Sequence, residues 1–476
     1  MKQFSLFLSF LFLSVCAFAN NIRVTNVSLI NQDITYDSYQ VKFDIAWDNS
    51  WRTSTNESNW DAAWIFIKYR TSYNAEWKMA YISRYNNDIL KPAGAEIIPG
   101  SEFGGNTCAG VMMYRNGNGN GNISFTDAVI KWKYSNQIGD NDRIEIAVSA
   151  IEMVYVPESP FSVGDGNYGF HKGGSSAPYV ITGEGAVTLG GTSPQNMVSG
   201  SGDDDDFDFN TTQNLPYNFP KGYNAFYCMK YECSMGQYTD FLNKLESTKA
   251  LEHFANTTSF GYTIIRNNLD SFNTVTPDRA CNYVSFNDAR DYASWAGLRL
   301  MSELEYEKAC RGDNLPVSSE FANGISFNPN AANVNQSNII NPGTGMEILN
   351  VNASVIIAPN IGQPLRCGII AASQTTATRV NTGATYYGIM EMSGNVGELC
   401  VGVSDQSQRD FSANIFSIYP ATSLSFNPSK CTVRGGFFID ILTVVDPVSQ
   451  RGNNVLMQSV TERNGYIGFR CVISGL

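Results

Sequence analysis

The chain has 476 residues, enough for two or three domains with full cores. Charged residues make up 16% and aromatic residues 12%, and glycine and asparagine are abundant, a composition typical of an extracellular β-rich protein. The formal net charge of −12 argues against nucleic acid as a partner, because phosphate binding requires clustered Lys and Arg. After the first residues, no stretch reaches the roughly 18 to 20 apolar residues of a membrane span.

Residues 1–19 read as a signal peptide. Lys2 precedes an apolar run at residues 4–12, and AFA at residues 17–19 has the small-x-small pattern of a cleavage site. We expect cleavage before Asn20 and a protein that is secreted or at the cell surface or in the periplasm. The alternative is a lipoprotein box at residues 13–16 that ends at Cys16, although Val15, directly before the cysteine, fits that pattern poorly. Removal of Cys16 leaves nine cysteines, for which we expect several disulfides and at least one free thiol.

Residues 20–190 predict an all-β sandwich domain. Apolar and polar residues alternate with period two, and the clearest apolar face consists of Val41, Phe43, Ile45 and Trp47. Four tryptophans between residues 47 and 64 suggest stacking on carbohydrate, but in a sandwich such residues usually belong to the core.

Residues 191–214 are polar and contain GSGDDDDFD at residues 200–208. We interpret them as a solvated acidic and Gly/Ser-rich linker between two domains. A calcium-ordered loop is the alternative. It is weakened because the carboxylates are consecutive, so neighbouring side chains point to opposite sides of the chain.

Residues 215–476 predict a second domain with a strand at residues 225–231 and three capped helices. The helices begin at capping boxes, in which a serine is followed three residues later by Gln, Asp or Glu. The serines are Ser234, Ser285 and Ser302, and the second helix should end at Gly297. About 75 residues with few helix or strand signals follow, so long irregular loops are expected.

Three motifs close this second domain: GIMEMSGNVGELC at residues 388–400, RGG at residues 434–436 and GFRC at residues 468–471. Gly394 permits a positive φ and Asn395 can hydrogen-bond its own turn, so the first motif predicts a tight backbone corner. Together the motifs resemble the formylglycine-generating enzyme, or sulfatase-modifying factor, family. The resemblance implies an α+β C-type-lectin-like fold with long irregular loops.

The same resemblance bears on catalysis. Formylglycine-generating enzymes bind copper through two cysteines that follow RGG with the spacing C-x4-C, and Asp440 and Val445 stand at those positions here. A cuprous ion needs thiolate ligands, so we expect neither copper nor the family's oxidation chemistry. The iron-dependent branch of the family uses three histidines, whereas this chain has two, His171 and His253.

Calcium is the cofactor that the resemblance still supports. One family site uses carbonyl oxygens and a carboxylate, at positions that match Ser393, Gly394, Val396 and Glu398. A second site includes positions that match Asn333 and Val334. The alternative is that Glu398 only accepts backbone N–H bonds. Gly397 replaces the tryptophan of the family's corner, and unless another side chain fills that space the loss costs roughly 3–5 kcal/mol.

We therefore hypothesise an exported, non-catalytic protein that acts in ligand binding or cell-surface structure, with an extracellular protein or glycan as its partner. The alternative is a modifying enzyme of the family with an unrecognised site that uses Asp440 and Cys471. The loop after RGG is the predicted recognition patch, and a loop folded into the space beside Gly397 is the competing interpretation. The patch residues are Phe438, Asp440, Ile441, Leu442 and Asp446.

Overall fold

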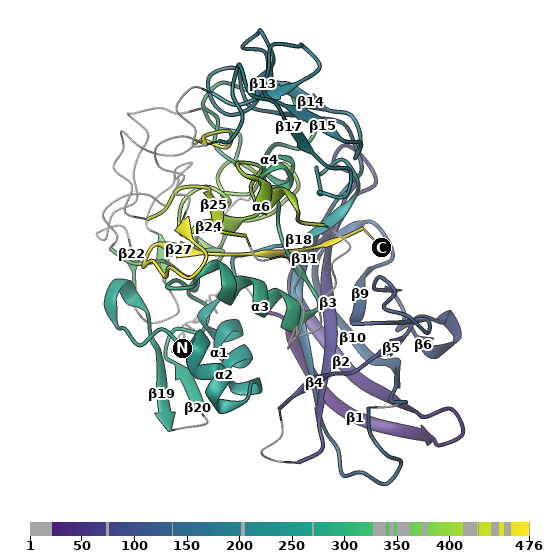
Figure 1. The fold of residues 1–476 in the computed structure, drawn as a ribbon. Coiled ribbons are helices and arrows are strands. Elements are labelled where there is room, and N and C mark those ends of the chain that lie inside the picture. Colours follow the sequence, from purple (N-terminus) through teal and green to yellow (C-terminus); the bar gives the residue numbers. More distant parts are fainter. Residues whose placement is uncertain are drawn as a thin grey trace, which may run out of the picture.

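A computed structural model describes most of the chain after the predicted signal peptide (Figure 1). The described residues are 21–72, 76–135, 137–200, 205–268, 271–326, 339–341, 347–349, 362–373, 378–412, 426, 428–438, 447–451 and 458–475.

Two large sheets pack face to face in the first part of the chain. The alternation predicted for Val41, Phe43, Ile45 and Trp47 is correct, since all four side chains are buried in the core between the sheets. The first sheet contains β1 (Arg23–Asp33), β2 (Ser38–Arg52), β10 (Gly119–Lys133), β5 (Ile82–Ser83) and β8 (Thr107–Cys108), with β6 (Ile89–Leu90) on β10. The second contains β21 (Arg299–Leu300), β28 (Cys471–Ser474), β18 (Phe226–Met229), β11 (Glu145–Val156), β3 (Asp61–Arg70), β9 (Gly110–Arg115) and β7 (Ala95–Pro99), with β4 (Lys78–Met79) on β3.

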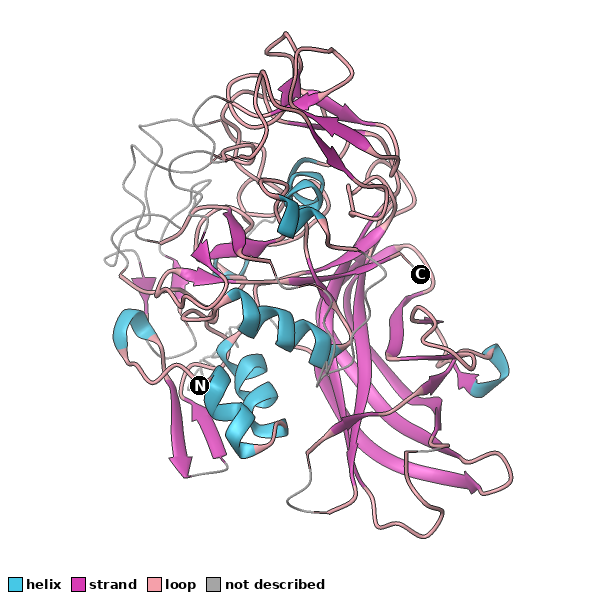
Figure 2. Ribbon diagram, viewed as in Figure 1, coloured by secondary structure: helices cyan, strands magenta, loops and turns pink. Residues whose placement is uncertain are grey.

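Strand β3 is buried on both faces. One set of alternate side chains packs against the first sheet, while the other faces the helices of the C-terminal part. On that second face the Trp64 indole donates to the carbonyl of Ala296 at 2.8 Å, and Phe66 packs edge-on against Trp295. The helices therefore cover the sheet as a third layer (Figure 2).

The second sheet crosses the predicted domain boundary. β11 pairs with β18 in antiparallel register from Met153↔Met229 to Val156↔Phe226, and β18 pairs in turn with β28. Sequence reasoning separated residues 20–190 from residues 215–476, but the structure joins them through this continuous sheet. Backbone pairing between distant strands has no local signature, which is why the pattern of turns suggested two units.

The segment predicted as a linker is folded where it is described. β16 (Met197–Val198) and β17 (Gln213–Leu215) belong to a four-stranded sheet with β13 (His171–Lys172) and β15 (Val187–Leu189). Asp205 pairs with Arg451 at 2.9 Å, and Asp206 pairs with Arg409 at 2.7 Å. The interpretation as a solvated linker is wrong for these residues, because their carboxylates hold arginines more than 200 positions away.

The three predicted helices form as expected. α1 (Met235–Lys244), α3 (Phe286–Ala296) and α4 (Glu303–Arg311) each begin at a complete capping box, and Gly297 ends α3 with φ 71°. The shorter helices are α2 (Ser247–His253), α5 (Ile369–Ala372) and α6 (Gln406–Arg409), with 3-10 turns η1 (Asn86–Asp88) and η2 (Ser259–Gly261).

The remaining strands form small sheets around this core. They are β12 (Phe161–Val163), β13 (His171–Lys172), β14 (Tyr179–Ile181), β15 (Val187–Leu189), β19 (Ile264–Asn268), β20 (Ser271–Thr274), β22 (Ile339–Ile340), β23 (Ile348–Leu349), β24 (Gly397–Cys400), β25 (Lys430–Arg434), β26 (Gln458–Ser459) and β27 (Ile467–Gly468). The β-rich character predicted from composition is confirmed. The C-type-lectin-like topology stays a prediction.

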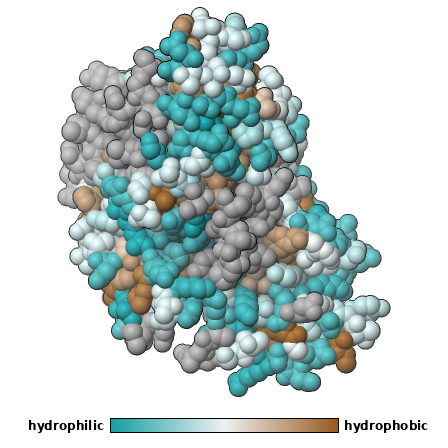
Figure 3. Space-filling model, in the orientation of Figure 1, coloured by the Kyte–Doolittle hydropathy of each residue, from teal (hydrophilic) through white to brown (hydrophobic). Residues whose placement is uncertain are grey.

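All nine described cysteines are buried, and the expected disulfides are not formed in the described part of the chain. Among the same residues, no helix combines the length and the apolar character that crossing a membrane requires. On the face drawn in Figure 3 hydrophilic residues predominate, and hydrophobic residues appear in small groups.

Candidate functional site

Residues 388–400 form the predicted tight corner, which then runs into β24. Gly394 and Asn395 have φ values of 88° and 61°. The amide of Gly394 donates to the carbonyl of Gly435 at 2.7 Å, and the Asn395 side-chain amide donates to Glu232 at 2.9 Å. These bonds fix the corner against the RGG segment and against the start of the C-terminal part.

The structure brings the three closing motifs together in one sheet. β24 pairs antiparallel with β25 and parallel with β27. Glu398 consequently lies opposite Arg434 on one side and Gly468 on the other. Their separation in sequence gave no indication of this register.

Glu398 is bound by an arginine. The Arg470 guanidinium contacts both carboxylate oxygens, with Nε 2.8 Å from Oε2 and Nη2 2.7 Å from Oε1. Its remaining N–H groups donate to the carbonyls of Met229, Lys230 and Met390. Both side chains are almost wholly buried, so this is a closed ion pair, in which Oε2 accepts a hydrogen bond from Nε and Oε1 has an ion-pair contact but no hydrogen-bond partner among the described residues.

Two further carboxylates lie beside this pair. Glu232 Oε2 is 3.9 Å from Arg470 Nη2 and has no hydrogen-bond partner among the described residues. Glu391 accepts from the amides of Gly368 and Ile370. Burial raises the pKa of Glu232 to about 8 and that of Glu391 to about 7. The Arg470 guanidinium therefore acts on three buried acids, and Arg366 also acts on Glu391. The raised pKa values favour a bound proton on Glu232 and Glu391 near neutral pH.

The arginine of the RGG motif is also structural. Arg434 Nη1 is 2.9 Å from Glu303 Oε2, and Nη2 is 3.0 Å from Glu307 Oε1. Both acids lie on α4, one turn apart, and Arg451 reaches the same Glu303. The network anchors α4 to the sheet that carries the motifs, and its members are buried.

A pocket of about 670 Å³ opens between the end of β2 and the segment that leads into the corner. We call it the junction pocket. Among the residues that line it are Trp51, Glu57, Lys230, Arg379, Tyr386 and Met390. Trp51 packs directly on Gly388, where a Cβ would lie 2.8 Å from the indole. Both parts of the chain therefore contribute walls.

The two cations of the junction pocket differ. Lys230 Nζ is held by Glu152 at 3.1 Å and Asp61 at 3.6 Å, so its charge is compensated. Arg379 has no carboxylate within 4 Å among the described residues, and its Nε has no hydrogen-bond partner there. Its guanidinium carbon lies 5.7 Å from the ring centroid of Tyr386, and burial lowers the pKa of Arg379. Glu320 and Glu57 act on this guanidinium only from beyond ion-pair distance. A partly buried guanidinium without a close carboxylate favours an anionic ligand.

Residues 180–474 match the family of sulfatase-modifying factor enzyme 1-like domains (FGE-sulfatase). The chain belongs to this family. The match begins upstream of residue 215, so the sulfatase-modifying factor domain includes the segment that sequence reasoning assigned to a linker. A stretch of 39 residues is 46% identical to hercynine oxygenase from Mycolicibacterium thermoresistibile; it covers 8% of this chain and 9% of that protein.

The described part of the chain shows no thiolate site of the kind that copper chemistry in this family requires. All nine described cysteines are buried, and burial raises the pKa of Cys471 well above its ordinary value, which keeps the thiol neutral. Within the same ranges, no group of three or more His, Cys, Asp or Glu side chains could hold a metal ion. Asp440 and Val445, at the positions of the copper-binding pair, lie outside the described residues.

The corner does not fit the calcium ion that the family implies. Arg470 occupies both oxygens of Glu398, and a divalent cation beside this guanidinium would be repelled. The expectation that Glu398 accepts backbone N–H bonds is also incorrect, since its partner is a side chain 72 positions away. The predicted corner ligands were Ser393, Gly394, Val396 and Glu398. The other predicted ligands, Asn333 and Val334, lie outside the described residues.

Phe437 fills the space that the missing tryptophan would need. A Cβ on Gly397 would lie 2.8 Å from Val433 Cγ1 and 3.2 Å from Phe437 Cδ1. The Phe437 ring packs on Tyr466 with centroids 4.4 Å apart. The substitution at Gly397 is therefore compensated by a neighbouring aromatic side chain from the segment after RGG.

Restoring the tryptophan should consequently destabilise the protein. We expect Gly397→Trp to lower the free energy of unfolding by at least about 1–3 kcal/mol through overpacking. In a Phe437→Ala background the same substitution should cost less, because a cavity then receives the indole. Urea unfolding of the four proteins measures the coupling. Equal cost in both backgrounds would show that Phe437 does not occupy this space.

Phe438 is part of the core. It is fully buried beside Tyr231 and Val396, and its amide donates to the carbonyl of Asn395 at 3.0 Å. The exposed-patch interpretation is wrong for this residue, because the backbone turns inward directly after RGG. The other predicted patch residues, Asp440, Ile441, Leu442 and Asp446, lie outside the described part of the chain.

Sequence reasoning missed the junction pocket. It noticed Trp51 but assigned the segment's tryptophans to the core, and it singled out neither Arg379 nor Tyr386. Arg379 is an isolated basic residue in a polar stretch, a pattern that usually marks a solvated surface. The signal that reveals it is spatial, namely the absence of a carboxylate partner within 4 Å in the described structure.

Proposed function

We propose that this chain is a non-catalytic, ligand-binding member of the sulfatase-modifying factor family, and that its ligand occupies the junction pocket. The observation that carries the proposal is the guanidinium of Arg379, which has no carboxylate within 4 Å among the described residues and lines a pocket of about 670 Å³. Pockets of this size that combine aromatic walls with a few polar groups are typical ligand sites.

The chemistry of the pocket defines the ligand. Arg379 favours an anionic group, because a guanidinium binds carboxylate or phosphate oxygens with charge-assisted hydrogen bonds. Trp51 and Tyr386 supply aromatic side chains for a flat apolar group. An acidic group carried by an extracellular protein or glycan meets both requirements.

Export is part of the same proposal. The leader pattern at residues 1–19, which lies outside the described residues, supports a protein that is secreted or at the cell surface or in the periplasm. A binding or surface-structural role suits that location. Calcium bound elsewhere, with Asn333 and Val334 among its ligands, also remains a proposal.

An enzymatic role is the alternative, and the short match to hercynine oxygenase favours it. The side chains seen here oppose it. His253 contacts Asp288 at 2.9 Å, and both ring nitrogens of His171 lie 3.1 Å from backbone carbonyls. Each histidine of the sequence is thus occupied in the fold, and the described thiols are buried.

Ligand-observed NMR with the purified full chain tests the junction pocket. The probes are benzoate and its neutral counterpart benzamide. We expect saturation transfer to benzoate at millimolar concentration and at least tenfold weaker binding of benzamide, since a hydrogen bond to a charged group contributes roughly 1.5–3 kcal/mol. Arg379→Gln should remove the preference for the anion, and Trp51→Ala should weaken both probes.

Arg143→Gln is the matched control, because Arg143 is exposed and does not line this pocket. Its binding should equal that of the unaltered chain. Failure of benzoate to bind, or equal binding by the Arg379 variant, would contradict the assignment of the site. Separately, aldehyde formation on a cysteine-containing sulfatase-type peptide, with copper and above a no-protein control, would contradict the non-catalytic role.

A further inference from the structure

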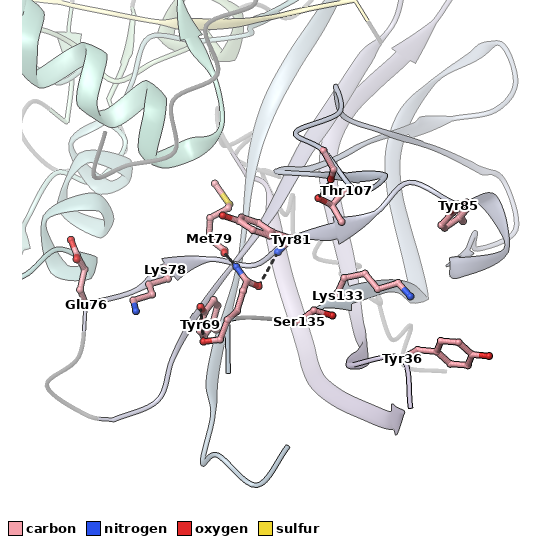
Figure 4. Close-up of a pocket in the computed structure, with 13 residues that line it drawn as sticks. Tyr36, Tyr69, Glu76, Lys78, Met79, Tyr81, Tyr85, Thr107, Lys133 and Ser135 are labelled. Carbon is pink, nitrogen blue, oxygen red and sulfur yellow. Dashed lines mark hydrogen bonds between the residues drawn. The ribbon is translucent and has the colours of Figure 1, made fainter. Parts of the chain in front are cut away.

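A second pocket, of about 880 Å³, lies on the N-terminal sheets and involves none of the family motifs (Figure 4). We call it the tyrosine pocket, because four tyrosines from separate elements converge on it. Tyr36 lies in the turn between β1 and β2, and Tyr69 lies in β3. Tyr81 directly precedes β5, and Tyr85 directly precedes η1. Such convergence from four chain segments does not follow from the sequence pattern of any one of them.

Two of these tyrosines are unusually open to solvent. Tyr36 is 68% exposed and Tyr85 is 58% exposed. Figure 4 shows both on the same side of the pocket, with the side chain of Lys133 extending toward that side. Tyrosine presents a large rigid face with few rotatable bonds, so exposed rings beside a pocket bind a flat partner at low entropic cost.

The pocket is locally cationic in an acidic chain. Lys78 and Lys133 line it, and neither has a carboxylate within 4 Å among the described residues. The lining carboxylate, Glu76, is paired with Lys249 at 3.2 Å. Although Asp88 acts on Lys133 from a greater distance, two lysines without a close carboxylate in one pocket of a chain with a net charge of −12 favour an anionic ligand.

The floor of the pocket is fixed. The side-chain amide of Gln137 donates to the carbonyl of Met79 at 2.8 Å, and its oxygen accepts from Trp132 Nε1 at 2.7 Å and from the amide of Tyr81 at 3.4 Å (dashed lines in Figure 4 mark two of these bonds). These bonds hold the side chain of Gln137 in place. Hydroxyl and ammonium groups remain, including Ser135, Thr107 and the lysines.

We propose that the tyrosine pocket binds a short acidic saccharide, in which Tyr36 and Tyr85 contact the C–H faces of sugar rings and Lys133, which extends toward the same side, binds an anionic group. The volume suits a unit of about two sugar residues. Carboxylate and sulfate groups share this chemistry. The site is independent of the junction pocket, so either can fail without the other.

Calorimetry with the full chain tests this site with three disaccharides: digalacturonic acid, a monosulfated galactobiose and neutral galactobiose. We expect either acidic probe to bind at least tenfold more tightly than the neutral one, and binding to weaken as salt is added. The tighter of the two acidic probes identifies the anion. Tyr36→Ala/Tyr85→Ala should lower affinity at least tenfold, and Lys133→Gln should remove most of the preference for acidic probes.

Tyr217→Ala is the matched control, since Tyr217 is 76% exposed and does not line the pocket. Its affinity should equal that of the unaltered chain. Unchanged melting temperatures in the tyrosine variants exclude a folding effect. The proposal is overturned if neither acidic probe binds at millimolar concentration, if the tyrosine double variant binds normally, or if adenosine monophosphate binds more tightly than both.

Discussion

Arg470→Met should lower the free energy of unfolding by about 3–5 kcal/mol, because it leaves the buried carboxylate of Glu398 without its partner. The loss should be larger than that of an ordinary surface ion pair, since Glu232 and Glu391 lie beside the same guanidinium. Urea unfolding followed by tryptophan fluorescence measures the change.

A double variant distinguishes the cost of an unpaired Glu398 carboxylate from the cost of losing the Arg470 side chain itself. When Glu398→Gln is added to Arg470→Met, much of the stability should return, because an uncompensated buried charge costs more than two neutral groups of similar shape. Arg143→Met, at an exposed position, should change stability by less than about 0.5 kcal/mol. A loss below about 1 kcal/mol for Arg470→Met would show that this ion pair does not hold the motifs together.

Glu232→Gln should make the protein less sensitive to pH. The folded-state pKa of Glu232 is about 8, raised by burial from an ordinary value of 4.5. Between those values the folded state retains a proton that the unfolded state has released, so stability falls as pH rises from about 5 to 8. Glutamine imitates the protonated acid and removes this contribution, which is on the order of a few kcal/mol.

The measurement is the melting temperature between pH 4 and pH 8.5. Near pH 4, below the unfolded-state pKa of 4.5, the variant should match the unaltered chain, and near pH 8.5 it should be the more stable of the two. Glu391, with a pKa of about 7, should leave a smaller dependence of the melting temperature on pH in both proteins. Glu158→Gln, at an exposed site, should retain the full slope. Parallel curves for Glu232→Gln and the unaltered chain would exclude a buried proton at Glu232.

Local chemistry was predictable from the sequence. The capping serines Ser234, Ser285 and Ser302 start helices because the bonds that cap them are made within three residues. The positive φ of Gly394 and Asn395 is likewise a property of the residues themselves. The alternation in β2 identified its buried face because side chains in a strand point alternately to opposite sides.

Partners that are distant in sequence were not predictable. Glu398 was expected to bind calcium or backbone amides, whereas its partner is Arg470. Asp205 and Asp206 look like solvated charges until Arg451 and Arg409 are placed beside them. In each case the residue type indicated a need for compensation, and only the tertiary fold determined what provides it.

The pairing of β11 with β18 gives the N-terminal part a protective role. β18 pairs with β28 along one edge and with β11 along the other. Without β11, that second edge would expose unsatisfied N–H and C=O groups that could pair with another copy of the chain. The face of α3 that covers Trp64 and Phe66 would be bare as well. A fragment cut at residue 180, where the family match begins, should therefore be prone to self-association, because β11 and β3 cover these surfaces in the full chain.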